Sequence, residues 1–258
     1  MSAYRAVPAD GAAWVTGASS GLGRGLALEL ARRGFTVYAT ARRAEAVEAL
    51  AAEVAGLKGR IVAAPGDVTD RDGMAALYAS FEARGPVALA VLNAGGAWRD
   101  KPGDFGGEAF QRTFAVNVQG VANGVNPALE AMRARRRGQI VVVGSLIGYG
   151  GVPNAYAYGP SKAAVISLAV GLKCLAEPMG IGVQVVNPGY VRTELTAGNR
   201  YPMPFLMDCD AACRRIADGI SRGGFEIRLP RRFALLVRFV QSLPYPVFFA
   251  LFRAFGLR

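Results

Sequence analysis

The chain has 258 residues, a formal net charge of +11 and no histidine. The missing histidine excludes a Ser-His-Asp hydrolase, a histidine-based zinc site and a histidine general base. Because 52% of the residues are hydrophobic and only 19% are charged, the chain can bury a large core and is not disordered as a whole. Acid–base chemistry must therefore come from Tyr, Lys, Asp, Glu, Ser or Cys, or from a bound cofactor.

Cysteine content, charge and the N-terminus narrow the class of protein further. Cys174, Cys209 and Cys213 are too few for a disulfide framework and, without histidine, make a poor metal site, so no metal is expected. The first residues carry no apolar stretch of a secretory signal, which favours a cytoplasmic protein. The arginines are scattered and match no zinc-finger, basic-zipper or RNA-recognition signature, so no nucleic-acid partner is expected.

Apolar segments alternate with helical segments along the chain. Strands are predicted at 12–16, 36–40, 61–64, 87–92, 139–143, 181–186 and 225–229. Helices are predicted from the loop after the first strand through 33 and at 44–55, 70–84, 108–136 and 156–177. Pro127 should mark a bend or a restart in the fourth of these helices. The alternation predicts one α/β domain at 1–230, a Rossmann-type doubly wound parallel sheet of about seven strands with helices on both faces.

A glycine-rich loop, Thr-Gly-Ala-Ser-Ser-Gly-Leu-Gly at 16–23, joins the first strand to the first helix. Glycines let a backbone approach a pyrophosphate closely, and a helix N-terminus offers free N–H groups to it. The position between strand and helix is the one that a dinucleotide site requires, although the G-x-x-x-G-x-G spacing differs from the commoner G-x-G-x-x-G. A plain turn is the alternative. The loop predicts cofactor contacts from Gly17, Ser19, Ser20, Gly21, Leu22 and Gly23.

The residues after the second strand discriminate between the two nicotinamide cofactors. A protein that binds NAD(H) usually has Asp or Glu there to accept from the ribose hydroxyls. Here Arg42 and Arg43 follow the strand, and the first carboxylate is Glu45. A guanidinium pairs with a 2′-phosphate, which a carboxylate would repel. The arginines therefore favour NADP(H) over NAD(H), the alternative being that they are ordinary surface residues.

Tyr158 and Lys162 are four residues apart in a predicted helix and so share one of its faces. Pro160 fits between them only in the first turn, which puts both side chains near the N-terminal end of the helix. An ammonium about 4 Å from a phenol contributes up to about 4 kcal/mol, or roughly three pKa units, toward the phenolate. Such a pair brings a tyrosine into range as an acid or base, but taken alone it is mostly structural.

Several motifs in chain order together resemble the short-chain dehydrogenase/reductase family. Ser145 stands thirteen residues before Tyr158, as in typical members, and the match runs from about Trp14 to Thr193. The motifs that carry the resemblance are the loop at 16–23, Asp67, Asn93-Ala94-Gly95, Asn117, Ser145, Tyr158-x-x-x-Lys162 and Asn187-Pro188-Gly189.

The resemblance implies a catalytic set of Asn117, Ser145, Tyr158 and Lys162. Tyr158 would exchange a proton with the substrate oxygen, to which Ser145 would donate a hydrogen bond. Lys162 would lower the pKa of Tyr158 and hold the nicotinamide ribose. Asn117 would hold a water that connects Lys162 to solvent.

Further cofactor contacts and an oligomer also follow from the resemblance. Asp67 and Val68 would contact the adenine, while hydride transfer belongs to the cofactor. The remaining contacts would come from Asn93, Ala94, Gly95, Tyr158, Lys162, Pro188, Gly189, Val191 and Thr193. A homodimer or homotetramer would form through the helices at 108–136 and 156–177.

The segments after Gly189 bear on the substrate. The family resemblance implies that 190–208 forms one wall of the substrate pocket. Its Tyr201, Phe205 and Met207 favour an apolar substrate, although a dry contact between subunits would have the same composition. Residues 231–258 extend past the usual end of the family as an amphipathic, hydrophobic segment interrupted by prolines, and from Ile227 onward there are six arginines and no acid. One interpretation is a helical hairpin on an anionic membrane surface, on the inner face of the membrane. The other is a flap over the substrate pocket or a dimer face.

Two functional hypotheses follow. The first is an NADP(H)-dependent oxidoreductase that interconverts a ketone and a secondary alcohol on a small hydrophobic molecule that resembles a lipid. The second is a non-catalytic nucleotide-binding or membrane-associated scaffold with the same fold. The intact Ser145, Tyr158 and Lys162 favour the first.

Overall fold

The computed structural model describes residues 4–54, 56–98, 105, 107–153, 155–199 and 202–254. Tyr201 and residues 255–258, which the sequence assigns to the substrate loop and the extension, lie outside the described residues. Seven parallel strands form one sheet in the order β3-β2-β1-β4-β5-β6-β7, which confirms the predicted fold class. The strands are β1 Ala12–Thr16, β2 Thr36–Thr40, β3 Arg60–Ala63, β4 Val87–Leu92, β5 Gly138–Val143, β6 Ile181–Pro188 and β7 Glu226–Leu229.

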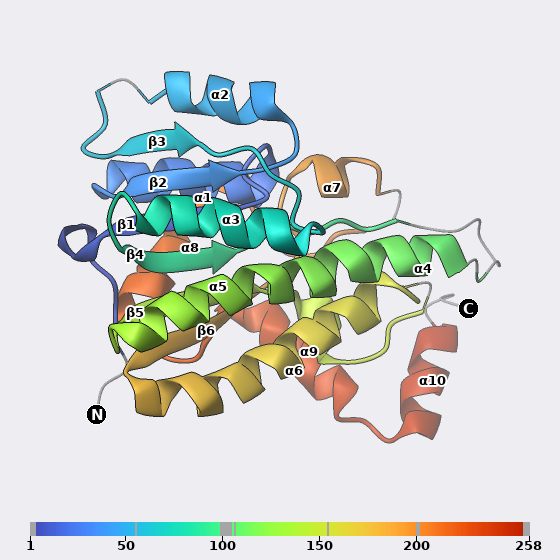
Figure 1. The fold of residues 1–258 in the computed structure, drawn as a ribbon. Coiled ribbons are helices and arrows are strands. Elements are labelled where there is room, and N and C mark those ends of the chain that lie inside the picture. The colour runs from blue at the N-terminus through green and yellow to red at the C-terminus, as the bar shows by residue number, and fades with distance from the viewer. Residues whose placement is uncertain are drawn as a thin grey trace.

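Helices cover both faces of this sheet (Figure 1). Buried side chains of α1, α2 and α8 form one core cluster, and those of α3, α5 and α6 form the other. In Figure 1 the helices α3, α5 and α6 lie in front of the sheet, with α1 and α8 behind it. The bounds of these helices are α1 Gly21–Arg32, α2 Ala44–Ala52, α3 Arg71–Glu82, α5 Gly120–Ala134, α6 Tyr158–Ala176 and α8 Cys209–Arg222.

The central strands are buried on both faces, so each face of the sheet has its own hydrophobic core. All six residues of β4 are buried, as are all eight of β6, and the sequence of β4 is an uninterrupted apolar run. The strand order reverses between β1 and β4. Ligands of open α/β sheets bind beyond the carboxyl ends of the strands at such a reversal, so the fold itself marks the place of the site.

Shorter elements complete the chain. Asp70 caps α3 by accepting a hydrogen bond from the Gly73 N–H at 3.0 Å. After β7 the extension forms two helices, α9 Arg231–Gln241 and α10 Tyr245–Ala254. The remaining elements are η1 Pro8–Asp10, α4 Gly107–Phe114, η2 Ala115–Gln119, η3 Leu146–Tyr149, η4 Glu177–Met179 and α7 Glu194–Ala197.

The predicted restart at Pro127 is wrong, because α5 continues through this residue. Pro127 lies inside α5, and the irregular part of the long helical stretch is the π-helical turn η2 between α4 and α5. A π turn inserts a residue into the helix and re-aims the side chains it carries. Asn117 lies in that turn and is fully buried.

One helical stretch, Tyr158–Met179, is long and apolar enough to cross a membrane by length and composition, with a mean hydropathy of 1.2. In the fold it is a core helix. Val165 and Ala176 have no exposed surface and Leu172 is buried. Its apolar composition is accounted for by packing against β5 and β6.

Candidate active site

Thr16, the last residue of β1, is hydrogen-bonded to the residues that follow β4. Its hydroxyl oxygen accepts from the backbone N–H of Asn93 at 3.0 Å and of Ala94 at 3.1 Å, and the Asn93 amide donates to the Thr16 carbonyl at 3.0 Å. Gly17 follows with φ +71°, and a Cβ there would lie 2.7 Å from the Ala94 Cα. Only glycine fits this position, because both its backbone angle and its neighbour exclude a side chain.

The glycine loop faces the segment after β6. Gly21 has φ +52°, and a Cβ built on it would lie 3.2 Å from the Thr193 methyl group. Ser20 is the N-cap residue of α1, without a side-chain capping bond, so the first N–H groups of α1 are open to a ligand. The structure thus has a narrow cradle of backbone N–H groups between α1 and Thr193, which fits a pyrophosphate.

Arg43 lies against this cradle. Its guanidinium Nη2 donates to the Ser19 hydroxyl oxygen at 3.2 Å. Arg42 and Arg43 are both exposed, and neither has an acidic partner among the described residues. Two guanidinium groups without carboxylates next to the glycine loop provide a cationic patch.

Asp67 and Val68 follow β3 on the same side of the site. The Asp67 carboxylate accepts from both the backbone N–H and the hydroxyl of Thr69 at 2.9 Å. The Val68 carbonyl accepts from the Asn123 amide at 2.8 Å, which ties this loop to α5. Leu22, the other loop residue, is half-buried against the core that α8 completes.

Asn117 is held by three hydrogen bonds. Its amide oxygen accepts from the Gly96 N–H at 2.8 Å, and its amide nitrogen donates to the Gly96 carbonyl and to the Ser161 hydroxyl, both at 3.0 Å. Ser161 in turn donates to the Tyr158 carbonyl at 2.8 Å. The π turn is therefore bonded to the β4 loop and to the first turn of α6.

Lys162 is buried, with 3% of its surface exposed. Its ammonium donates to the Val143 carbonyl at 2.9 Å and lies 5.8 Å from the centre of the Tyr158 ring. A Cβ on Gly95 would lie 3.3 Å from this nitrogen and 3.2 Å from the Asn117 amide oxygen, so these two polar groups meet at Gly95. Burial lowers the pKa of Lys162 to about 8 because desolvation penalises the charged form.

Ser145 and Tyr158 border the open side of this cluster. Ser145 ends the β5 segment and caps η3; its hydroxyl donates to the Pro188 carbonyl at 3.3 Å. Tyr158 is the first residue of α6, and Pro160 is in the first turn as the sequence requires. Because α6 packs on η3, both hydroxyl-bearing residues lie at the carboxyl edge of the sheet.

The segment from Pro188 to Thr193 forms the remaining side. Val191 is buried and pairs with Met207 in an isolated parallel bridge. A cavity of about 380 Å³ lies next to it, lined by α7 and by residues that include Thr193, Met203 and Leu206. Every residue that lines this cavity belongs to the segment 190–208, and neither Ser145 nor Tyr158 lines it.

Three features that support the site were not predicted from the sequence. Thr16 and Ser161 were noted only as members of motifs, although Thr16 is hydrogen-bonded to Asn93 and Ser161 to Asn117. Helix α8 was not predicted at all. Its apolar residues at helical spacing were the available signal, since Ala212, Ile216 and Ile220 are all buried.

A family model for short-chain dehydrogenases matches residues 11–203. The chain belongs to the short-chain dehydrogenase/reductase family. An uncharacterized oxidoreductase of Myxococcus xanthus is 38% identical over 237 residues, which cover 92% of this chain and 94% of the relative.

Solved structures of other short-chain dehydrogenases have the same fold. A Sphingobium yanoikuyae enzyme in complex with NADPH has a TM-score of 0.79 at 27% identity, over 88% of this chain and 92% of that one. A Mycobacterium marinum short-chain dehydrogenase/reductase has a TM-score of 0.76 at 29% identity, over 84% and 93%. Both alignments cover nearly the whole of the solved chain, so this short-chain dehydrogenase/reductase shares their architecture rather than an isolated motif.

Proposed function

We propose that this short-chain dehydrogenase/reductase uses NADP(H) to interconvert a ketone and a secondary alcohol on a hydrophobic substrate. The observation that carries the proposal is the meeting of Lys162 and Asn117 at Gly95 beside Tyr158. A buried ammonium near a phenol, at the strand-order reversal of an open sheet, suits proton transfer to a ligand in the crevice.

Tyr158 is the proposed acid and base. When bound, the nicotinamide supplies or accepts the hydride at the substrate carbon. In the direction of reduction, Tyr158 gives its phenolic proton to the substrate oxygen, and Ser145 donates a hydrogen bond to that oxygen as its charge grows. The Lys162 ammonium stabilises the tyrosinate left behind.

Asn117 and Lys162 complete the proposed proton path. A lysine with a pKa of about 8 exchanges its proton readily near neutral pH, so it can return a proton to Tyr158. Asn117 uses its amide on Gly96 and Ser161 and thereby fixes the π turn beside Lys162. We propose that this turn also holds the water through which the proton reaches solvent.

NADP(H) is the proposed cofactor, in preference to NAD(H). The contact between Arg43 and Ser19 places a guanidinium at the edge of the glycine loop, where an adenosine 2′-phosphate could be paired bidentately. The proposed contacts of the rest of the cofactor are the backbone of 17–23, Asp67 and Val68 for adenine, and 93–95 with 188–193 for the nicotinamide half. The Sphingobium relative, which contains NADPH, is consistent with this choice.

Aromatic residues support an apolar substrate. Tyr190 and Phe205, from the substrate loop, each lie 5.7 Å from the Phe233 ring of α9, centre to centre. Phe233 also approaches Gly189, where a Cβ would lie 2.9 Å from its ring. We propose that these three rings form an apolar wall of the substrate pocket, which is the flap role that the sequence left open for the extension.

The exchange of Tyr158 for Phe tests the function. Full-length protein should oxidise NADPH with at least one member of a panel of hydrophobic ketones. Tyr158→Phe should lower kcat by at least about 100-fold because the proton donor is gone, with NADPH affinity retained. The neighbouring exposed Tyr156→Phe is the matched control and should keep the activity.

The hypothesis of a non-catalytic scaffold predicts no NADPH oxidation with any ketone and no effect of Tyr158→Phe. If the unchanged protein turns over no carbonyl in the panel, or if Tyr158→Phe is as active as the parent, the catalytic proposal fails.

We further propose that the protein is a cytoplasmic homodimer or homotetramer. Its subunits would meet through α4–α5 and α6, and Val170 and Leu175 are exposed apolar residues of α6.

A further inference from the structure

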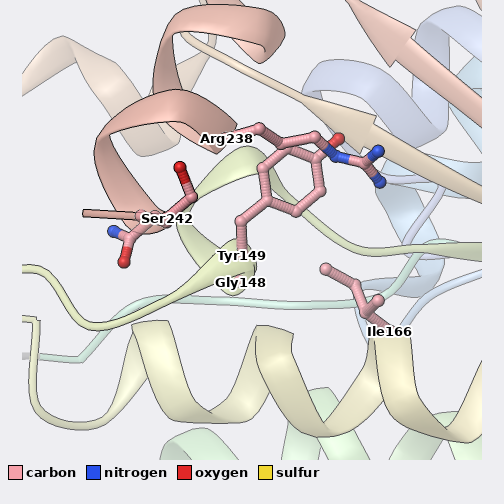
Figure 2. A pocket seen from close by; sticks show the side chains of 6 residues that line it. Gly148, Tyr149, Ile166, Arg238 and Ser242 are labelled. Atoms are coloured by element: carbon pink, nitrogen blue, oxygen red, sulfur yellow. The ribbon is translucent and has the colours of Figure 1, made fainter. Parts of the chain in front are cut away.

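Two polar residues in the second half of helix α9, Arg238 and Gln241, contact the rest of the protein. Arg238 pairs with the Glu226 carboxylate at 2.9 Å and lies over the Tyr149 ring, 4.9 Å from its centre. Gln241 donates to the Gly151 carbonyl at 3.0 Å. Figure 2 shows Arg238 beside the Tyr149 ring, at a cavity of about 360 Å³ that Ser242 and Ile166 also line. These contacts fix the rotation of α9 about its axis.

The opposite face of α9 is apolar and exposed. Leu235, Leu236 and Phe239 are 57%, 50% and 64% exposed, whereas Ala234 is fully buried. An ordinary surface helix turns its whole apolar stripe to the core. In α9 the buried Ala234 and the polar contacts of Arg238 and Gln241 face the fold, whereas Leu235, Leu236 and Phe239 face outward without a partner among the described residues.

Helix α10 continues this exposed surface. Phe248 is buried beneath it and packs on Phe252 at 4.5 Å between ring centres. Tyr245, Val247 and Phe249 of α10 are all more than half exposed. We call residues 231–254 the C-terminal arm. Among the described residues, six of the thirteen exposed large hydrophobic side chains lie in the arm, which concentrates apolar surface on one small part of the molecule.

The charge of the C-terminal arm identifies the partner. Arg231, Arg232 and Arg253 are exposed beside the apolar side chains, and the sequence has no acidic residue after Glu226. Exposed apolar side chains flanked only by cations match the interface of an anionic bilayer, where rings and leucines enter the acyl boundary and arginines meet phosphates. We propose that the C-terminal arm docks this protein on an anionic lipid surface.

A second copy of the chain fits the C-terminal arm less well. In a two-fold dimer the same patch faces itself, so the arginines of one arm would meet those of the other without a carboxylate from either arm. The arm also does not span the bilayer. Helix α9 has 11 residues and α10 has 10, which is about half the length that a membrane-crossing helix needs. We therefore expect α9 and α10 to lie in the plane of the membrane surface.

Docking would also place the substrate pocket at the lipid surface. Phe233 on the inner side of α9 touches Gly189, while Leu236 and Phe239 face away from the fold. One helix thus separates the apolar wall of the pocket from the exposed stripe. The docking itself is independent of the proposed oxidoreductase activity and can be measured without a substrate.

Vesicle flotation of the full-length protein tests the docking. The protein should float with vesicles of equal parts phosphatidylglycerol and phosphatidylcholine, stay in solution with phosphatidylcholine alone, and bind less at high salt. A triple variant, Leu235→Ser with Leu236→Ser and Phe239→Ser, should lose at least about tenfold in vesicle affinity. The matched control is Val7→Ser, an exposed apolar residue outside both the C-terminal arm and the helices of the proposed oligomer, which should float like the parent.

A charge-matched pair of variants separates the C-terminal arm from the net charge. Arg232→Glu with Arg253→Glu should weaken binding at least about tenfold, whereas Arg71→Glu with Arg84→Glu, which changes the net charge equally on exposed sites of α3 and its following loop, should not. All variants should bind NADPH like the parent.

Three results would overturn the proposal. The parent protein could fail to float with anionic vesicles at low salt. Both charge variants could lose affinity equally, which would make net charge the cause. Light scattering could show that the triple variant breaks an oligomer while vesicle binding is unchanged, which would make the stripe an interface between copies.

Discussion

Lys162 combines burial with charge in a way that few lysines do. Its ammonium donates to the Val143 carbonyl, and 3% of its surface is exposed. Burial lowers its pKa to about 8, whereas an unfolded chain has a lysine pKa of about 10.4. The folded protein without cofactor therefore binds fewer protons than the unfolded one between these values. Its charged form costs stability below about pH 8, and the cost disappears as the pH rises toward the unfolded pKa.

Lys162→Met should separate stability from activity. At pH 7 the cofactor-free variant should gain about 1–3 kcal/mol in the free energy of unfolding, since the shift of the pKa corresponds to at most about 3 kcal/mol and the Val143 carbonyl loses a partner. The gain should shrink toward pH 10, and turnover should fall by at least about 100-fold. Urea denaturation at several pH values measures the stability.

The control for this variant lies in the same helix. Lys173 forms an exposed pair with Glu177 at 2.7 Å, so Lys173→Met should change stability by no more than about 0.5 kcal/mol at any pH. A Lys162→Met protein that is less stable than the parent at pH 7, or whose gain is the same at pH 10, would contradict the idea that desolvation burdens this residue.

At the residue scale, motif spacing located the candidate site but not its internal bonding. Tyr158, Lys162 and Ser145 were identified from sequence, and the structure places them at one edge of the sheet. The hydrogen bond from Asn117 to Ser161 joins residues 44 apart in the chain, and such a contact has no local sequence signal. The contact between Gly21 and Thr193 is likewise set by the strand order.

At the element scale, the regular segments were predictable and the irregular ones were not. The predicted bounds of β1, β2 and β4 agree with the structure because a strand buried on both faces is an apolar run with clear ends. The π turn at Ala115–Gln119 contains Asn117, whose side chain contacts the distant Gly96 backbone. No local sequence signal marks this turn, whereas Pro127 is a visible one, so the sequence predicted the irregular point at Pro127 instead.

Glu226 joins three elements around η3. Its carboxylate accepts from the Tyr149 hydroxyl at 2.5 Å, from the Asn187 amide at 2.8 Å and from Arg238 at 2.9 Å. Burial and this carboxylate raise the pKa of Tyr149, so the phenol stays protonated and donates. Since η3 begins after Ser145 and Asn187 precedes Pro188, Glu226 positions both sides of the proposed oxygen site through its neighbours.

Glu226→Gln should therefore loosen this part of the fold. The loss of charge leaves Arg238 unpaired and weakens two hydrogen bonds, for about 1–3 kcal/mol of stability. We expect the ketone KM to rise more than kcat falls, because Ser145 and the wall of Phe233 are displaced while Tyr158 and Lys162 stay in place. Thermal unfolding and steady-state kinetics measure the two effects.

Arg228 provides the comparison for Glu226→Gln. It meets the same carboxylate only at 3.5 Å, so Arg228→Gln should cost less than about 0.5 kcal/mol and leave KM unchanged. Equal effects of the two variants, or a Glu226→Gln enzyme with parental KM and stability, would show that the carboxylate does not position η3.

At the scale of the whole molecule, the candidate cofactor site joins the two halves of the sheet. The glycine loop and Arg43 belong to the half with β1, β2 and β3, whereas Thr193 follows β6 in the other half. A dinucleotide that contacts both would stabilise the chain as a unit by mass action. The positive charge of the molecule, +11 in total, attracts a polyphosphate to either half.

NADPH should therefore raise the melting temperature of the whole chain in a single transition. At about 100 times the dissociation constant the gain is about 2.7 kcal/mol, or roughly 5–10 °C for a domain of this size. NADH at the same concentration should give a smaller shift, because it has no phosphate for Arg43. Arg43→Ala should reduce the shift with NADPH to that with NADH and leave the NADH shift unchanged, whereas Arg84→Ala, which removes an exposed arginine in the loop after α3, should alter neither. Equal losses with both cofactors would mean that Arg43 supports the glycine loop through Ser19 instead of pairing with a phosphate.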